Sequence, residues 1–380
     1  SVIERQSQRK TTFLNQPLES ALQIQATSLT MFPTTRQDWG KAPDYSVFYG
    51  RTEELTTLKQ WIVTERCRIV AVLGMGGIGK TALSVKLAQQ IQDEFDYVIW
   101  RGLRNAPPIE KILAEIINFL SNQQERHLPE ALEDKISRLL HYLNNSRCLL
   151  VLDNFESILL INDLAGNYRE GYEEYGELIR RVGETSHQSC LMLTSREKPK
   201  EIALLETQTL PVRSLQLNGL DKTTAWEILQ EKGLSDQQDS EALITLYRGN
   251  PLALYLVSAI IKDLFGGSVS NFLSINTLFI GDFGFLLEEQ FNRLSELEKK
   301  IMYFLANQQK PVSLKQLLEH IQADIRISKV KILDALQSLL RRSLLEKITE
   351  ESEILFTIQP VMIEYIKEHI QFENITSNDR

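Results

Sequence analysis

Cysteine is scarce in this sequence, with Cys67, Cys148 and Cys190 the three cysteines in a chain of 380 residues. An odd number of distant cysteines argues against a disulfide framework, and no Cys-x-x-Cys pair or Cys/His cluster indicates a zinc site. Cys148 and Cys190 lie in or beside apolar runs, where a free thiol usually packs as a small apolar group. These features predict a reducing, cytoplasmic environment.

The sequence also lacks an apolar run of 18 residues and a recognisable signal peptide, so we expect no membrane span. Positive charge is not in excess, because 42 Lys and Arg against 50 Asp and Glu give a formal net charge of −8. This balance argues against a nucleic-acid partner. Apolar residues at 43% are ordinary for a globular protein, and at roughly 150 residues per domain the length allows two to three domains. The chain begins at Ser1 without a methionine, which fits a fragment of a longer protein.

Strand and helix patterns alternate along the first half of the chain. Apolar, β-branched runs at 68–73, 97–101, 148–152 and 190–195 predict buried strands, and amphipathic helical patterns separate them. Strands that alternate with helices require crossover connections and therefore a parallel sheet. We predict an α/β nucleotide-binding domain at 38–212, preceded at 1–37 by a polar linker with a helix remnant.

Helical patterns dominate the second half of the chain. Asp221 and Pro251 mark the starts of two helices in a predicted small helical domain at 213–284. One helix is expected from 285 to 306, then helices at 313–321 and 327–342, strands at 344–348 and 353–358, and a final helix after Pro360. Three helices followed by a β-hairpin predict a winged-helix domain at 285–372, which leaves a tail at 373–380.

One segment matches a complete phosphate-binding motif. Residues 74–81, Gly-Met-Gly-Gly-Ile-Gly-Lys-Thr, satisfy the pattern G-x-x-x-x-G-K-[ST] between a predicted strand and a predicted helix. The glycines allow successive backbone N–H groups to turn toward an anion. Lys80 can reach the β- and γ-phosphates, and the Thr81 hydroxyl can ligate Mg²⁺. The candidate binding residues of this phosphate loop are Gly74, Gly76, Gly77, Ile78, Gly79, Lys80, Thr81 and Ala82.

The same glycines also spell G-x-G-x-x-G, the fingerprint of dinucleotide-binding folds. That alternative needs an acidic residue at the end of the second strand, about 20 residues later. Here the acidic residues Asp93, Glu94 and Asp96 precede the strand at 97–101 instead. The dinucleotide alternative also gives Lys80 and Thr81 no role, so a phosphate loop is favoured.

A second acidic group for magnesium follows the apolar strand at 148–152. Asp153 lies at the carboxyl end of that strand, where ligands bind in parallel sheets. It is the predicted partner of Thr81 in a magnesium site. Asn154 stands where a fast ATPase would place a carboxylate, and an amide is a poor proton acceptor, so we expect slow hydrolysis. Glu156 is either a substitute for that carboxylate or a solvated helix-start residue.

Arg196 follows the strand at 190–195, at the same end of the sheet as Asp153. Its guanidinium could meet a γ-phosphate with several donors, and the alternative is a surface arginine paired with a carboxylate. The candidate catalytic residues are therefore Lys80, Asp153, Asn154 and Arg196.

The order of these motifs resembles that of the NB-ARC family of STAND nucleotide switches over residues 38–372. The lead-in at 38–44, Asp-Trp-Gly-Lys-Ala-Pro-Asp, is similar to that of cyanobacterial multidomain members. The phosphate loop, the block at 95–104, the strand before Asp153 and the run Thr194-Ser195-Arg196 follow one another as in the family. The resemblance implies that Arg196 meets the γ-phosphate.

Two further matches imply where adenine binds. The segment Val-Phe-Tyr-Gly-Arg at 47–51 is similar to a family element whose backbone borders adenine. The segment Gly-Asn-Pro-Leu-Ala at 249–253 resembles the GLPL motif, whose proline packs on adenine. The resemblance therefore implies adenine contacts from Phe48, Tyr49, Arg51, Pro251 and Leu252.

The chain departs from the family at its Met-His-Asp motif, which falls on Ile358-Gln359-Pro360. Gln359 stands in place of the histidine that clamps the β-phosphate of ADP, and the aspartate is lost. Gln359 can donate an amide hydrogen bond but cannot be protonated. It is the candidate phosphate contact of the winged helix.

The resemblance implies a signalling switch that binds ADP or ATP with Mg²⁺ and hydrolyses ATP weakly. ADP would hold the three domains closed, and ATP would favour an open form that assembles into homo-oligomers. Sensor and effector domains or proteins would lie outside this fragment. Two alternatives remain open: a winged-helix transcription regulator controlled by ATP, and a metabolic P-loop ATPase.

Overall fold

The structure is a computed structural model, and it describes residues 35–125, 128–234, 237–275, 281–308, 310–324, 327–350 and 353–378. The predicted linker and helix remnant at 1–34 lie outside the described residues, as do the last two residues of the predicted tail. Arg36 and Gln37 are wrongly predicted as linker, because both lie in the first strand of the sheet.

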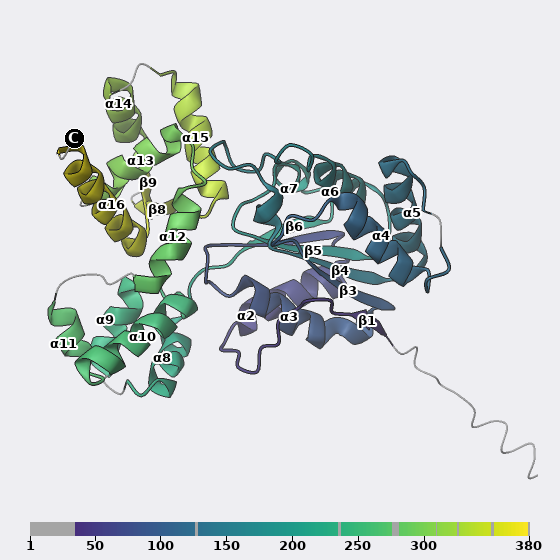
Figure 1. The fold of residues 1–380 in the computed structure, drawn as a ribbon, viewed down its shortest axis with the longest axis horizontal. Helices are drawn as coiled ribbons and strands as arrows, with labels where there is room; N and C mark the ends of the chain where they lie inside the picture. Colours follow the sequence, from purple (N-terminus) through teal and green to yellow (C-terminus); the bar gives the residue numbers. More distant parts are fainter. Residues whose placement is uncertain are drawn as a thin grey trace, which may run out of the picture. The chain divides into compact units, whose positions relative to one another are not determined.

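Within the described residues, six strands form one parallel sheet in the order β1-β3-β4-β5-β2-β6 (Figure 1). Parallel pairing joins every neighbouring pair of strands in this order, which confirms the α/β prediction. The strands are β1 (Arg36–Asp38), β2 (Ile69–Leu73), β3 (Tyr97–Gly102), β4 (Cys148–Asp153), β5 (Cys190–Ser195) and β6 (Val212–Gln216).

The two edge strands, β1 and β6, were not predicted as strands. All residues of β2, β4 and β5 are buried, whereas β1 and β6 are largely half-buried or exposed. A strand with one solvated side carries polar residues, so the sequences Arg-Gln-Asp and Val-Arg-Ser-Leu-Gln show no continuous apolar run. The sheet therefore extends to Gln216, past the predicted domain end at 212.

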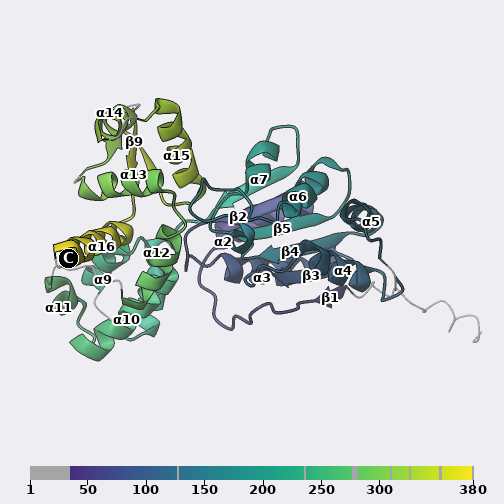
Figure 2. The same cartoon turned by 45° about the horizontal axis from the view of Figure 1, so that its top comes forward.

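Helices cover both faces of this sheet (Figures 1 and 2). Side chains of Ile69, Ala71 and Leu73 join one core, and those of Val70 and Val72 join the other, because successive side chains of a strand point to opposite faces. The first core is completed by α4 (Ile109–Leu120), α5 (Leu132–Asn145), α6 (Glu174–Glu184) and α7 (Lys200–Leu205), and the second by α2 (Thr52–Lys59) and α3 (Lys80–Ile91). Short helical turns are η1 (Gln60–Thr64), η2 (Gln92–Glu94), η3 (Phe155–Ile158) and η4 (Gly281–Phe283).

Four helices follow within the described residues, and the sequence predicts the starts of two of them. Asp221 caps the first of them, since its Oδ1 accepts the N–H of Thr224 at 3.0 Å. Asn250 caps another, with Pro251 in its first turn. These helices are α8 (Lys222–Glu231), α9 (Gln237–Leu246), α10 (Pro251–Phe265) and α11 (Val269–Ser274).

Two glycines allow the segment before α8 to pack closely against the segment before α10. A Cβ at Gly219 would lie 1.7 Å from the carbonyl oxygen of Arg248, and one at Gly249 would lie 2.3 Å from that of Leu220. The N–H of Leu220 donates to the Gly249 carbonyl at 2.8 Å. The two backbone segments therefore touch so closely that only glycine fits between them.

The C-terminal region contains a three-stranded antiparallel sheet of order β7-β9-β8 among further helices. The prediction of a single helix from 285 to 306 is wrong, because one helix ends at Phe291 and a second begins at Glu296. Ser295 caps the new helix in a reciprocal box with Glu298, a Ser-x-x-Glu signal that the sequence does contain. The elements are α12 (Gly284–Phe291), α13 (Glu296–Asn307), β7 (Val312–Ser313), α14 (Leu314–Asp324), α15 (Lys329–Arg341), β8 (Glu346–Glu350), β9 (Glu353–Thr357) and α16 (Pro360–Asn378).

Across the described parts of the chain, no helix combines the length and apolarity needed to cross a membrane.

Candidate nucleotide-binding site

The phosphate loop joins the end of β2 to the start of α3. Gly79 has a φ of 100° directly before Lys80, so the backbone turns into the helix with its N–H groups at the helix N-terminus. Gly77 has a φ of 75°, and a Cβ there would lie 2.9 Å from Leu252 Cβ. The loop is therefore shaped for glycine both by its own turn and by α10 packed against it.

Lys80 is buried and folds back under the loop. Its ammonium donates to the carbonyl oxygens of Gly74 and Met75, at 2.9 Å and 3.0 Å. Burial lowers the pKa of Lys80 to about 8, with the Glu156 carboxylate opposing this shift and the Arg196 guanidinium adding to it. An ammonium held mainly by neutral carbonyls would gain from an anion, so Lys80 fits a phosphate ligand.

Asp153 receives two hydroxyl groups at one carboxylate oxygen. Thr81 Oγ1 donates to its Oδ1 at 2.9 Å, and Thr194 Oγ1 donates to the same atom at 2.6 Å. Burial raises the pKa of the Asp153 carboxyl, and the two hydroxyl donors oppose that rise. Thr81 and Asp153 thus meet as predicted, while the part played by Thr194 was not predicted.

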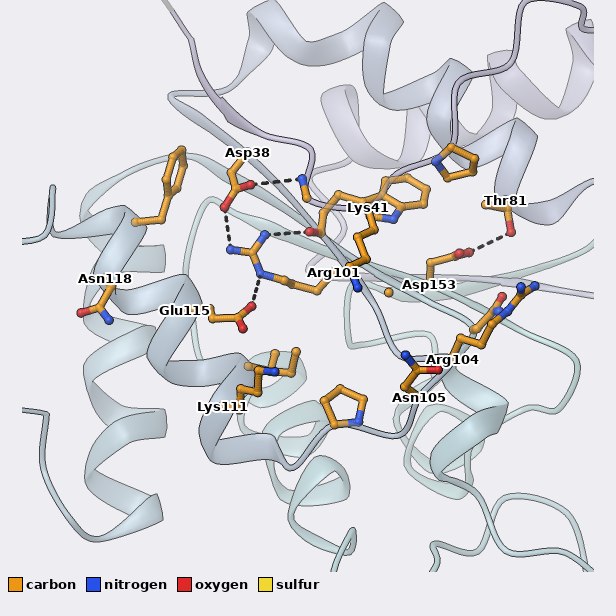
Figure 3. A pocket seen from close by; sticks show the side chains of 18 of the residues that line it. Asp38, Lys41, Thr81, Arg101, Arg104, Asn105, Lys111, Glu115, Asn118 and Asp153 are labelled. Atoms are coloured by element: carbon orange, nitrogen blue, oxygen red, sulfur yellow. Dashed lines mark hydrogen bonds and ion pairs between the residues drawn. The ribbon is translucent and has the colours of Figure 1, made fainter.

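A cavity of about 1000 Å³ lies beside this pair and is lined by Thr81, Asp153 and Asn154 (Figure 3). On its far side, Arg101 pairs with Asp38 at 2.6 Å and with Glu115 at 3.0 Å. The remaining basic residues of the lining are Lys41, Arg104 and Lys111. The cavity leaves room for water and for an anion next to the Thr81 and Asp153 oxygens.

This oxygen set fits magnesium. No group of three or more His, Cys, Asp or Glu side chains within the described residues is placed to hold a metal ion. Mg²⁺ does not require such a cage, since it usually keeps several waters and takes one or two carboxylates plus phosphate oxygens. Thr81 and Asp153 beside an open cavity supply that arrangement.

Glu156 points into the site rather than into solvent. It is 8% exposed, and its carboxylate lies 3.3 Å from Nε of Arg196 and accepts the Arg196 N–H at 3.3 Å. The solvated-helix interpretation of Glu156 is therefore wrong. Asn154 has a left-handed backbone, and its N–H donates to Thr194 Oγ1 at 3.0 Å. The Thr194 hydroxyl thus fixes both Asp153 and Asn154.

Arg196 lies at the carboxyl end of β5, against the phosphate loop. A Cβ at Gly76 would lie 3.6 Å from its guanidinium carbon. Besides Glu156 it pairs with Glu289 of α12, at 2.9 Å from Nη1 to Oε2. The structure therefore places Arg196 beside the loop and in ion pairs with carboxylates, and its contact with a γ-phosphate stays a prediction.

The segment at 47–51 reaches the loop through its arginine. Arg51 is 7% exposed, and its Nη2 donates to the Ile78 carbonyl at 3.1 Å. Phe48 packs against the core that contains α3, and the Tyr49 hydroxyl donates to Glu231 of α8. The segment therefore bridges the sheet, the loop and the helical region.

The start of α10 rests on the other side of the loop. Asn250 donates from Nδ2 to the Gly76 carbonyl at 3.1 Å, and its Oδ1 caps the helix. Pro251 and Leu252 follow against Gly79 and Gly77. Asn250 is a site residue that the sequence indicates as a helix cap but not as a loop contact.

Gln359 is half-buried, and its carbonyl accepts the first hydrogen bonds of α16 from Met362 and Ile363. In the described part of the chain, its side chain makes no hydrogen bond to the phosphate loop. A different glutamine does so: Gln290 of α12 is 3% exposed, and its Oε1 accepts the Gly76 N–H at 3.3 Å. Sequence patterns gave no signal for Gln290.

Comparison with known proteins yields a match between the NB-ARC domain model and residues 51–239. An uncharacterized WD repeat-containing protein of Nostoc sp. is 50% identical over 348 residues, covering 88% of this chain and 27% of the relative. The disease resistance protein RPM1 of Arabidopsis thaliana is 29% identical over 93 residues, 23% of this chain and 10% of that protein. The chain thus spans about a quarter or less of these relatives' lengths.

Among solved structures, the Walker-type ATPase of Pyrococcus abyssi superposes with a TM-score of 0.55 at 16% identity, covering 89% of this chain and 100% of that chain. A likeness at this identity speaks for the fold alone.

Proposed function

The chain belongs to the NB-ARC family, and we propose from this that it is a signalling switch operated by ADP, ATP and Mg²⁺. The observation that carries the proposal is the convergence of distant segments on one loop. Arg51, Asn250 and Gln290 each donate to or accept from the backbone of residues 76–78, although they are separated by up to 214 residues from their partners. Phosphate binding to this loop would therefore affect each part of the chain that contacts the loop.

The ligand contacts follow from the geometry of the loop. Backbone N–H groups at the start of α3 and the Lys80 ammonium would hold the β-phosphate, and Thr81 and Asp153 would hold Mg²⁺. A magnesium ion held by Thr81 and Asp153 would supply positive charge against the phosphates. Adenine would lie between the two segments that flank the loop, which carry Phe48, Tyr49, Arg51, Pro251 and Leu252. Gln359 stays a predicted phosphate contact.

Hydrolysis is proposed to be slow. Asn154 offers an amide beside Asp153, and an amide cannot accept the proton of an attacking water. Glu156 has a carboxylate, but Arg196 occupies it in this structure. A slow ATPase keeps its triphosphate state long enough to signal, which favours a switch over a metabolic ATPase.

We propose that nucleotide exchange moves two parts of the chain relative to the sheet. These parts are the helices at 213–284 and the winged-helix-like arrangement at 285–372. Both touch the loop, through Asn250 and through Gln290. Moving a two-state equilibrium from 1:99 to 99:1 requires about 5.5 kcal/mol of differential affinity. ATP would favour an open form that assembles into homo-oligomers, and sensor or effector parts would lie in the rest of a longer protein.

The transcription-regulator alternative is less well supported by the packing of α15. The Ala165 N–H donates to Ser338 Oγ at 2.6 Å, and the Lys198 N–H donates to the Arg341 carbonyl at 2.9 Å. One side of α15 and its C-terminal end therefore lie against the nucleotide-binding domain, which restricts its access to a DNA groove.

The test is nucleotide binding by calorimetry with Mg²⁺·ADP, for the wild type and for Lys80→Ala. Lys80→Ala should abolish binding because it removes the buried cation of the loop. Lys86→Ala is the matched control, since Lys86 is exposed on the same helix and should leave affinity unchanged. Equal affinity in Lys80→Ala and the wild type would contradict the proposed function.

A further inference from the structure

Helix α12 places two consecutive side chains on the phosphate-loop site. Gln290 Oε1 accepts the Gly76 N–H at 3.3 Å, and the Glu289 carboxylate lies 2.9 Å from Nη1 of Arg196. Both acceptors are oxygen atoms, and one of them carries negative charge. The family resemblance directs one partner, Arg196, to the γ-phosphate of ATP, and the other partner, the Gly76 N–H, belongs to the phosphate loop.

These contacts meet at one point beside the loop. A Cβ built on Gly76 would lie 3.4 Å from Gln290 Oε1 and 3.6 Å from the Arg196 guanidinium carbon. A γ-phosphate is an anionic group of oxygens that accepts hydrogen bonds from loop N–H groups and from arginine. A carboxylate and an amide oxygen supply the same kinds of acceptor in the same neighbourhood.

We propose that Glu289 and Gln290 take the place of the γ-phosphate, so that the closed chain accepts ADP and selects against ATP. The proposal rests on the proposed function and adds the residues that set its preference between the two nucleotides. ATP binding then requires α12 to withdraw from Gly76 and Arg196, and ADP binding does not. Glu289 and Gln290 are specificity-determining residues in this scheme.

The helix is fixed to the site one turn later as well. Arg293 donates from Nη2 to the carbonyl oxygens of Glu156 and Leu159, at 3.0 Å and 3.2 Å. It also pairs with Glu197, the neighbour of Arg196. Arg293 lies in the turn that directly follows α12, so these contacts anchor the C-terminal end of the helix to the same site. Withdrawal of α12 would therefore be a movement of the whole helix.

The experiment compares the affinities of Mg²⁺·ADP and of Mg²⁺ with a non-hydrolysable ATP analogue, by competition against a fluorescent ADP. The variants are Glu289→Ala, Gln290→Ala and the double variant. Because the competing acceptors are removed, the double variant should bind the ATP analogue about tenfold more tightly relative to ADP than the wild type does. Affinity for ADP should stay within about twofold.

Glu288→Ala is the matched control, since it removes the same charge from the adjacent exposed position, which lines a separate small pocket with Tyr365 and His369. It should leave the ratio of the two affinities unchanged. Glu289→Ala alone guards against a folding defect, because its side chain is 64% exposed. It should move the ratio in the same direction as the double variant.

The outcomes separate the two proposals. A wild type that binds neither nucleotide contradicts the proposed function. Intact ADP binding with an unchanged ratio in both Glu289→Ala and the double variant overturns the role of α12 alone. An equal loss of both nucleotides in folded Glu289→Ala also overturns it, since the residue would then support the site without discriminating.

Discussion

Arg342 and Glu197 form an ion pair in which both side chains are 2% exposed, with 2.5 Å between Nη1 and Oε1. The same guanidinium lies 3.1 Å from Oε1 of Glu298 in α13. Glu197 directly follows Arg196, so neighbouring residues face the phosphate loop on one side and the C-terminal helices on the other. This buried network links the nucleotide-binding domain to the C-terminal region.

Removing one partner of this link should be costly. Arg342→Ala leaves two carboxylates buried, and breaking a buried pair typically costs about 3–5 kcal/mol. Denaturant unfolding would measure the loss in the free energy of unfolding. Arg341→Ala changes the same charge one position earlier, outside the network, and should cost less than about 1 kcal/mol. Similar losses in the two variants would contradict a special role for Arg342.

Thr194 should control magnesium affinity without touching the metal. Its hydroxyl donates to Asp153 and accepts from the Asn154 N–H, so Thr194→Val leaves both groups less well oriented. Loss of such a supporting contact typically weakens metal binding by about 10- to 100-fold. A Mg²⁺ titration of ADP affinity measures the effect. Thr194→Ser keeps the hydroxyl and should retain most of the affinity, and a valine variant with wild-type magnesium dependence would sink the idea.

Asn154 should limit the rate of ATP hydrolysis. We expect phosphate release by the wild type to be well below the typical enzyme turnover of roughly 10 per second. Asn154→Asp supplies a carboxylate at a left-handed position that aspartate tolerates, so it should raise the rate. Steady-state phosphate release measures both. Wild-type turnover at the typical rate would favour the metabolic ATPase instead.

The cysteines should resist modification in the folded chain. Burial raises the pKa of Cys67 to about 11 and that of Cys148 to about 12, and it also raises the pKa of Cys190. The thiolate is the reactive form. Raised pKa values therefore keep these thiols protonated near pH 7.5, and their reaction with thiol reagents is slow. A colorimetric disulfide reagent should titrate all three after unfolding and almost none before. Rapid reaction in the native chain would show that the apolar runs around them open easily.

Local sequence patterns predict the elements whose residues are fully buried in the core. Strands β4 and β5 are buried on both faces, so their apolar runs identify them, and the glycine, lysine and threonine of the loop have little freedom to be anything else. Strand β6 has a solvated side, and the polar residues Arg213 and Ser214 interrupt its apolar pattern. The sequence therefore does not predict it as a strand. Helix patterns are continuous across the break before Ser295, where a capping box outweighs them.

Site residues that act through tertiary contacts have no comparable sequence pattern. Lys80, Thr81 and Asp153 are predictable because the chemistry of phosphate and magnesium fixes their types and spacing. Gln290 is one polar residue on a helix, and its meeting with Gly76 spans 214 positions along the chain. Asn250 reads as a helix cap from its place before Pro251, and only the fold turns its second polar atom toward the loop.

The close approach of Gly219 and Gly249 also has a consequence for the proposed opening of the helical region. Because residues 219–220 and 248–249 are clasped backbone to backbone, they travel as one body with α10. Leu217 is tied to the sheet, since its N–H donates to the Leu73 carbonyl at 2.8 Å. In the proposed opening, the rotation of the backbone would therefore be confined to the exposed Asn218 between them. Asn218→Pro should slow nucleotide-driven opening in stopped-flow measurements while leaving ADP affinity intact, and unaltered kinetics would place the rotation elsewhere.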